Sequence, residues 1–385
     1  MERPVFRVPR SRAHETHRAL RDEILAALEP ILFDRVSEGA EVRRELERAF
    51  SAVVKQPFAC AVHSGTVGLF LALRACGVGR GDEVITVANS DISTTGAISM
   101  CGAVPVLCDV LESDYTIDVE RVEACITPRT RAILPVDLHG HPADVKRLRE
   151  LADRFELKIV QDAALATGAS DYQQPVGAFA DAAVFSFAPI KPLGSVGSGA
   201  MVTTSDPEVA ERLELLRGYG HAPVDKVEAP GYQNYLLEGY NVPLDPLQAT
   251  LLKVKLPFLD TWTQKRRAIA SAYAEGLRDS GAILPTFRPE SNPTFRSYTV
   301  RVADQQACHE ALRRAGIEAV LHYAPPITHY SVYNASGKEC SLPGASDLPV
   351  TEMLAAELLS LPVTVELTDG DVQYVVDTLC TALGV

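Results

Sequence analysis

The 385-residue sequence predicts an α/β protein whose mainly parallel sheet is covered by helices on both faces, followed by a smaller α+β region. Short apolar runs alternate with helical patterns along the first two thirds of the chain, and strands separated by helices favour parallel pairing. We expect strands at residues 84–88, 104–108, 132–138, 157–161, 182–187 and 200–204. The alternation loosens after Pro257, which indicates that a second structural unit begins there.

Helices are expected where apolar residues recur at helical spacing. In the first part of the chain they cover residues 41–54, 65–76 and 143–155. The last part should contain helices at 261–280, 305–315 and 369–382, with strands at 297–302 and 318–321. We therefore expect an N-terminal arm at 1–20 with little packing of its own, a large domain at 21–255 and a small domain at 256–385. Residues 222–246 should form an ordered loop.

Composition and charge exclude several classes of protein. The net charge of −13 argues against a nucleic-acid partner, because binding phosphates requires concentrated Lys and Arg. Apolar runs stay below the ~18–20 residues that a membrane-spanning helix needs, and the N-terminus lacks the apolar core of a signal peptide. The eight cysteines include no C-x-x-C pair and lie mostly in apolar runs, which is typical of free thiols in a reducing compartment. We expect a soluble cytoplasmic protein.

Two charged residues stand in apolar surroundings. Asp162 ends the run LKIVQD, so it should lie at the carboxyl edge of the sheet, where ligands bind. Lys191 follows the apolar run at 182–187 and stands between Ile190 and Pro192. Burial there would lower the pKa of its amine and make it a nucleophile. Taken singly, Asp162 could instead cap a helix, and Lys191 could be a surface residue with a buried stem.

A third feature opens the helix predicted at 65–76. Ser64, Gly65 and Thr66 are small residues at a helix N-terminus, where backbone N–H groups bind phosphate well. An ordinary helix cap would use the same residues. Ser186 could add a hydroxyl to the same anion. No P-loop occurs, and the glycines at 77, 79 and 81 form a turn rather than a dinucleotide-binding motif.

The three features together fit pyridoxal phosphate (PLP). This cofactor requires a phosphate cradle, a lysine that forms an imine, and a carboxylate that keeps the pyridine nitrogen protonated. The histidines of HGH at 139–141 do not predict a metal site, because no Cys or carboxylate stands at ligand spacing.

Several motifs occur in an order and spacing that a known family shares. They are SGT at 64–66, GVGRGDEVIT at 77–86, GAVPVLCDV at 102–110, YTID at 115–118, ITPRTRAILPVDLHGHPADV at 126–145, QDAALATGA at 161–169, FSFAPIK at 185–191, GYNVPLDPLQATLL at 239–252 and GIEAVLHYAPP at 316–326. The sequence thus resembles the DegT/DnrJ/EryC1/StrS family of PLP-dependent sugar aminotransferases from about residue 35 to the C-terminus. The resemblance implies fold type I, like aspartate aminotransferase, with a seven-stranded sheet in the large domain, and it implies a homodimer.

The resemblance also assigns roles to individual residues. Lys191 would be the Schiff-base lysine and Asp162 the partner of the ring nitrogen. The phosphate would be held by Ser64, Gly65, Thr66 and Ser186.

Three further residues match positions near the substrate or the subunit interface. Asn241 matches an asparagine that reaches the phosphate from the other subunit, so the active sites should lie at the dimer interface. His322 and Tyr323 match an HY pair near the substrate, and we expect His322 to take part in catalysis.

Four positions depart from the family pattern. Asp91 stands where an aromatic ring usually stacks on the cofactor, and Leu165 where Gln or His lies beside the ring. Gly197 begins a G-S-G that replaces the usual E-G-G, and Pro243 replaces a frequent arginine. Drift in a divergent subgroup and an altered acceptor or reaction both remain open.

The expected reaction moves an amino group from glutamate or glutamine to a keto sugar, most often nucleotide-linked, for antibiotic sugars or surface glycans. A keto-cyclitol or keto-aminoglycoside acceptor is the alternative of the same class. Dehydration, deoxygenation or epimerisation of a sugar is a second hypothesis. Retention of Lys191 argues against it, because dehydrating relatives carry histidine there. A third hypothesis is a non-enzymatic regulatory or scaffold protein, against which the joint retention of Lys191, Asp162, Ser186 and the SGT turn argues.

Overall fold

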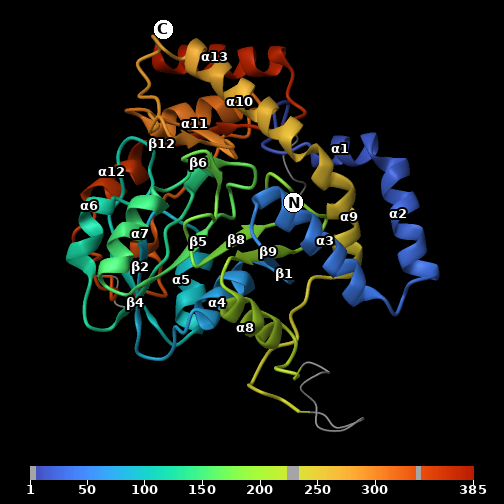
Figure 1. Ribbon diagram of the computed structural model, residues 1–385. Coiled ribbons are helices and arrows are strands. Elements are labelled where there is room, and N and C mark those ends of the chain that lie inside the picture. The colour runs from blue at the N-terminus through green and yellow to red at the C-terminus, as the bar shows by residue number, and fades with distance from the viewer. Residues whose placement is uncertain (1–5, 223–233, 335–339) are drawn as a thin grey trace.

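The computed structural model describes residues 6–222, 234–334 and 340–385, and Figure 1 shows their arrangement. The helices are α1 (Ala13–Ala19), α2 (Arg21–Phe33), α3 (Gly39–Val54), α4 (Gly65–Ala75), α5 (Ile92–Met100), α6 (Val119–Val122), α7 (Val145–Arg154), α8 (Pro207–Arg217), α9 (Pro246–Lys255), α10 (Leu259–Gly276), α11 (Gln305–Arg314), α12 (Pro349–Glu357) and α13 (Asp369–Leu383). The strands are β1 (Phe58–Val62), β2 (Glu83–Val87), β3 (Val104–Cys108), β4 (Thr130–Ile133), β5 (Lys158–Asp162), β6 (Ser170–Asp171), β7 (Gln174–Pro175), β8 (Ala182–Ser186), β9 (Ala200–Thr204), β10 (Ser291–Asn292), β11 (Ser297–Arg301) and β12 (Leu358–Pro362).

The main sheet has seven strands in the order β1-β9-β8-β5-β4-β2-β3. Every pairing from β8 to β3 is parallel, whereas β9 runs antiparallel to both of its neighbours. Parallel neighbours need long crossover connections, and α7 provides one between β4 and β5. The predicted α/β class with a mainly parallel sheet is confirmed.

Helices cover both faces of this sheet, because successive side chains of a strand point to opposite faces. In β8, Val184 faces α4, where a Cβ added at Gly68 would lie 2.8 Å from Val184 Cγ1. The next residue, Phe185, faces α3 and meets the ring of Phe50 edge to face, with 5.2 Å between the centroids. The edge of the sheet that carries the ends of β5 and β8 is therefore held rigidly between two apolar layers.

A second core lies above the main sheet in Figure 1, around the antiparallel pair β11–β12. Helices α10, α11 and α13 pack against this pair. Val8, from the predicted N-terminal arm, is fully buried in the same core and bridges to Ile317. The predicted strand at 318–321 is wrong, because the chain there makes only isolated bridges from Ile317 to Val8 and from Val320 to Ser360.

Helix α12 belongs to the C-terminal third of the chain but packs against the main sheet (Figure 1). Its Leu354 is buried in the core that contains β2 and β4. At its first turn, the backbone N–H groups of Val350 and Thr351 donate to Asp109, at the end of β3, at 2.9 and 2.8 Å. The proposed division of the chain at residue 255 remains a prediction.

Several elements differ from the sequence patterns. Helices α1, α2, α5, α6, α8, α9 and α12 and strand β12 were not predicted, and β4 ends at Ile133 rather than at 138. Residues 223–233 of the predicted loop at 222–246 lie outside the described residues. Across the described ranges, no helix has both the length and the apolar character needed to cross a bilayer.

Candidate active site

Asp162 and Ser186 end two adjacent parallel strands, β5 and β8. The register that pairs Asp162 with Val184 puts both residues at the same edge of the sheet. They line a cavity of about 410 Å³. Ten of the predicted site residues line it: Ser64, Gly65, Thr66, Asp91, Asp162, Leu165, Ser186, Lys191, His322 and Tyr323.

Lys191 reaches this cavity from the turn that connects β8 to β9. The backbone N–H and the hydroxyl of Ser195 both donate to the Phe187 carbonyl, at 2.8 and 2.7 Å, so the loop folds back on itself. Gly194 permits this turn, since a Cβ there would lie 2.6 Å from the Pro189 carbonyl oxygen. Burial lowers the pKa of Lys191 to about 8, although the charge of Asp162 opposes the shift. The amine is therefore much more available as a nucleophile than that of an ordinary lysine.

The carboxylate of Asp162 is buried, and two hydrogen bonds fix its orientation. It accepts a hydrogen bond from Thr94 Oγ1 at 3.2 Å and another from the Ala164 N–H at 3.1 Å. Burial raises the pKa of Asp162, while the Ala164 hydrogen bond and the charge of Lys191 oppose the rise. A buried carboxylate beside a cavity favours a cationic partner, and a protonated pyridine nitrogen is such a partner.

The N-terminus of α4 also lines the cavity. Ser64 caps the helix by accepting from the Val67 N–H at 3.3 Å, and the first N–H groups of the helix have no partner within it. A Cβ at Gly65 would lie 3.3 Å from Ser186 Cβ, so the glycine keeps the space beside the Ser186 hydroxyl open. The donors and the space fit a phosphate. The residues present thus fit PLP: a phosphate cradle, an amine and a buried carboxylate share one cavity.

His322 and Tyr323 close the cavity from the C-terminal unit. His322 Nδ1 lies 3.0 Å from the Ser360 hydroxyl. Burial, together with the charges of Arg296 and Arg10, lowers the pKa of His322 to about 3, so its ring is neutral at pH 7. Burial raises the pKa of Tyr323. Both side chains therefore face a ligand as neutral hydrogen-bonding groups.

The departures from the family pattern fall into two groups. Asp91 and Leu165 line the cavity, and Asp91 also caps α5 by accepting from the Ser93 N–H at 2.9 Å. Asn241, Pro243 and Gly197 do not line it. Asn241 is exposed, and Pro243 bridges to Val62 beside the edge strand β1. Asn241 therefore does not line the cavity of its own chain.

Two arginines that the sequence reasoning missed also line this cavity, Arg296 and Arg10. Arg10 forms an ion pair with Glu318 at 3.4 Å. Arg296 is 7% exposed, and its Nε has no hydrogen-bond partner among the described residues. It directly precedes β11, whose residues are all buried although their sequence, SYTVR, is of mixed polarity. A charged residue bordering a buried strand resembles the signal that identified Asp162, which ends an apolar run.

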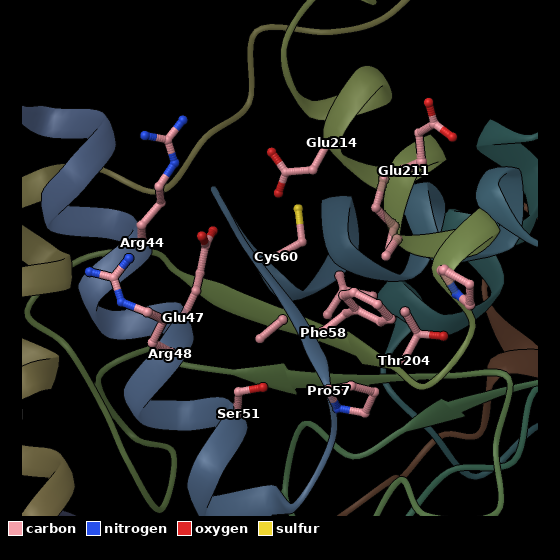
Figure 2. A pocket seen from close by; sticks show the side chains of 15 residues that line it. Arg44, Glu47, Arg48, Ser51, Pro57, Phe58, Cys60, Thr204, Glu211 and Glu214 are labelled. Atoms are coloured by element: carbon pink, nitrogen blue, oxygen red, sulfur yellow. The ribbon is translucent and has the colours of Figure 1, made fainter. Parts of the chain in front are cut away.

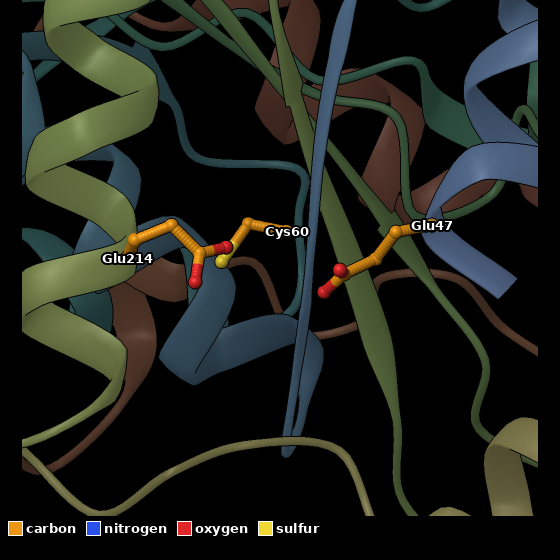
Figure 3. A group of neighbouring side chains, drawn as sticks. All are labelled: Glu47, Cys60 and Glu214. Carbon is orange, nitrogen blue, oxygen red and sulfur yellow. The ribbon is translucent and has the colours of Figure 1, made fainter. Parts of the chain in front are cut away.

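A second cavity of about 500 Å³ lies between α3, β1 and α8, away from these residues (Figure 2). At its wall, donor atoms of Glu47, Cys60 and Glu214 lie within 4.8 Å of one another (Figure 3), a spacing that could suit a metal ion. Arg217, however, forms hydrogen-bonded ion pairs with both carboxylates. Burial also raises the pKa of the Cys60 thiol, which disfavours the thiolate that a metal needs. The cluster is therefore an internal ion-pair network.

Comparison with known proteins shows the same chemistry. The chain is 39% identical over 377 residues to dTDP-3-amino-3,4,6-trideoxy-alpha-D-glucose transaminase of Streptomyces venezuelae, covering 97% of this chain and 95% of that protein. It is 41% identical over 336 residues to the erythromycin biosynthesis sensory transduction protein EryC1 of Saccharopolyspora erythraea, covering 86% and 88%.

Solved structures agree with the sequence comparison. S. venezuelae DesV in complex with a ketimine intermediate superposes with a TM-score of 0.89 at 36% identity, covering 99% of each chain. The PLP-form of Spr1654 from Streptococcus pneumoniae superposes with a TM-score of 0.80 at 25% identity, covering 89% of this chain and 91% of that one. The model of the DegT/DnrJ/EryC1/StrS aminotransferase family matches residues 19–380. The chain therefore belongs to this family of PLP-dependent aminotransferases.

Proposed function

We propose that this enzyme transfers an amino group from glutamate or glutamine to the keto carbon of a nucleotide-linked sugar, in the biosynthesis of antibiotic sugars or surface glycans. The observation that carries the proposal is the convergence of Lys191, Asp162 and the N-terminus of α4 on one cavity. The substrate class rests on relatives such as the dTDP-sugar transaminase, which aligns over 97% of this chain.

When bound, PLP supplies an aldehyde that captures the amino group and a ring that accepts electrons from the substrate carbon. Lys191 would hold the cofactor through its Nζ, and the same amine, when free, would remove a proton from the donor α-carbon. The same Nζ later returns a proton to the carbon of the acceptor, and its lowered pKa suits both steps. Asp162 keeps the ring nitrogen protonated and orients the ring. The α4 N-terminus and Ser186 anchor the phosphate.

We further propose that the enzyme works as a cytoplasmic homodimer. Asn241 is exposed and lies outside the cavity of its own chain, which supports its predicted role at the cofactor phosphate of the partner subunit. The neutral His322 would then act by hydrogen bonding to the substrate rather than as a charged acid.

The test begins with the purified protein loaded with PLP. Borohydride should fix the cofactor to the peptide that contains Lys191, and glutamate or glutamine should bleach the visible band. The aminated form should then be offered a dTDP-linked or UDP-linked keto sugar, a keto-cyclitol and a keto-aminoglycoside in parallel. Recovery of the visible band with the nucleotide-linked sugars supports the proposal.

Other outcomes would contradict it. If the visible band recovers only with the keto-cyclitol or the keto-aminoglycoside, that compound and not a nucleotide-linked sugar is the acceptor. A yellow protein that ignores every donor yet consumes a sugar would favour dehydration or epimerisation, and a protein that cannot be loaded with PLP would favour a regulatory role.

A further inference from the structure

Arg296 is a buried cation that forms no ion pair with any of the described residues. It is 7% exposed, its backbone N–H donates to the His139 carbonyl at 2.8 Å, and it lines the same cavity as Lys191. Among the described residues no carboxylate forms an ion pair with it. Burial and the nearby charges of Arg266 and Arg10 lower the pKa of Arg296 to about 10, so it still carries its charge at neutral pH.

The acidic groups near the cavity already have other partners. Glu318 pairs with Arg10, Asp91 caps α5, and Asp162 accepts from Thr94 and Ala164. Glu366, which lines a neighbouring cavity together with Arg296, accepts hydrogen bonds from the Thr16 and Thr364 hydroxyls. An uncompensated buried charge is costly. The protein tolerates this cost at a place where a ligand can approach, so the ligand itself should bring a negative charge.

The distance of each candidate anion from the reacting carbon indicates which of them Arg296 binds. The cofactor phosphate already has its cradle at Gly65 and Ser186. In an amino acid donor, the carboxylate is attached to the same carbon as the amine that must meet the cofactor held by Lys191. In a nucleotide-linked keto sugar, the sugar ring separates the diphosphate from the reacting carbon. A cation that lines the cavity beside Lys191 therefore suits the carboxylate better than the diphosphate.

We infer that Arg296 binds the α-carboxylate of the amino donor and thereby selects amino acids over amines that lack this group. The inference rests on the proposed function, because it names how that site recognises its donor. A guanidinium can bind a carboxylate with two parallel hydrogen bonds, which also fixes the orientation of the α-carbon. This contact would turn the α-hydrogen toward Lys191 Nζ.

The experiment compares two amines in the PLP-loaded protein: glutamate, and 4-aminobutyrate, which is glutamate without its α-carboxylate. Bleaching of the visible band is followed in wild type, Arg296→Gln and Arg296→Lys. In Arg296→Gln the half-saturating glutamate concentration should rise about 10- to 100-fold, the range expected for losing a charge-assisted hydrogen bond. The rate with 4-aminobutyrate should not change. Arg296→Lys should fall between, since an ammonium keeps the charge without the planar fork.

A matched control is Arg267→Gln. The Arg267 side chain bonds to the Pro293 carbonyl at 2.8 Å and does not line the cavity, so glutamate should react as in wild type. A binding readout that needs no turnover uses glutarate, a dicarboxylate without an amine. Calorimetric titration should detect glutarate in wild type and much weaker binding in Arg296→Gln.

Three results would overturn the inference. Arg296→Gln could react with glutamate as wild type does, or it could weaken glutamate and 4-aminobutyrate equally, which would mean a merely structural role. Arg296→Gln could also leave the half-saturating concentration of glutamate unchanged but raise that of the nucleotide-linked sugar, which would show that the arginine binds the acceptor. If wild type reacts with no donor, the proposed function fails, and the glutarate titration still decides whether Arg296 binds carboxylate.

Discussion

Arg217 and Arg296 are both buried arginines in this protein, but their surroundings differ. Arg217 lies in the ion-pair network beside β1, where Glu47 and Glu214 neutralise it (Figure 3 shows the two carboxylates). Arg296 lies at the active-site cavity, where no carboxylate pairs with it among the described residues. Glu47 also accepts from the Ala61 N–H at 2.8 Å, so it binds the edge strand of the sheet.

This difference separates two reasons for burying a charge. In the network, each charged group has its partner within the chain, and the result is a fixed junction between α3, β1 and α8. At the cavity, Lys191 and Arg296 are held without full compensation, so their free energy falls only when a cofactor or substrate arrives. A buried charge whose partner is missing is therefore a better guide to the active site than cavity size, since a cavity of comparable volume lies beside the network.

The largest effect is expected at Lys191. Lys191→Ala should reduce transamination by at least about 10³-fold, because it removes both the covalent anchor and the group that carries the proton. The rate of bleaching of the PLP-loaded protein by glutamate measures this. Lys158→Ala is the control, because Lys158 pairs with Asp181 at 2.9 Å and does not line the cavity. Activity of Lys191→Ala near that of wild type would reject the assigned role.

Replacement by glutamine should destabilise the protein at Arg217 but not at Arg296. Arg217→Gln should lower the free energy of unfolding by about 3–5 kcal/mol, because it leaves Glu47 buried without its partner. Arg296→Gln should not lower the free energy of unfolding, because it removes a buried charge that has no ion-pair partner among the described residues. Urea denaturation of the protein without donor measures both. Equal destabilisation by the two variants would remove the distinction between paired and unpaired charges.

A smaller effect concerns the pH at which single lysines react. Burial lowers the pKa of Lys191 to about 8, whereas the hydrogen bond to Asp181 raises the pKa of Lys158 above its usual 10.5. A neutral amine is the reactive form, so acetylation of Lys191 in the cofactor-free protein should reach half its maximal rate near pH 8. Lys158 should still be accelerating above pH 10. Peptide mass spectrometry after brief acetylation measures both lysines in one sample.

The same experiment has an internal check. Asp162→Asn removes the attraction that opposes the lowered pKa of Lys191, so the midpoint for Lys191 should move to lower pH. A midpoint for Lys191 near that of Lys158 would contradict the description of the cavity as desolvated.

The sequence predicted strands β2, β3, β4, β5, β8 and β9 of the main sheet because short apolar runs bounded by polar residues are local signals. Helix α5 was missed, since its segment ISTTGAISM lies at the cavity and mixes polar with apolar residues. Helices α8 and α9 offered a signal that was not used. Each begins with Asp followed by Pro, at 206–207 and 245–246, and in each the aspartate caps the first N–H groups.

The site was predictable as far as its motifs reach. Lys191, Asp162 and the SGT turn meet at one cavity because the carboxyl ends of parallel strands share an edge. Arg296 was not predictable in the same way. Its position before β11 is a local signal, but its approach to Lys191 depends on how the β11–β12 unit sits on the main sheet, and that long-range packing is not part of the local signal.

The path of α12 has a consequence for the way the molecule can be divided. The chain leaves the main-sheet unit near residue 257 and builds most of the unit around β11–β12, called here the upper unit. It then returns through α12, whose Leu354 packs in the main-sheet core and whose Thr351 bonds to Asp109, and it leaves again along β12. Three covalent connections thus join the two units along this path, in addition to the N-terminal segment that places Val8 in the upper core. A C-terminal fragment that begins near residue 257 would contain α12 without the main sheet against which it packs, and the remaining N-terminal part would lose that helix. Exchange of the β11–β12 unit between relatives must therefore keep α12 together with the main sheet.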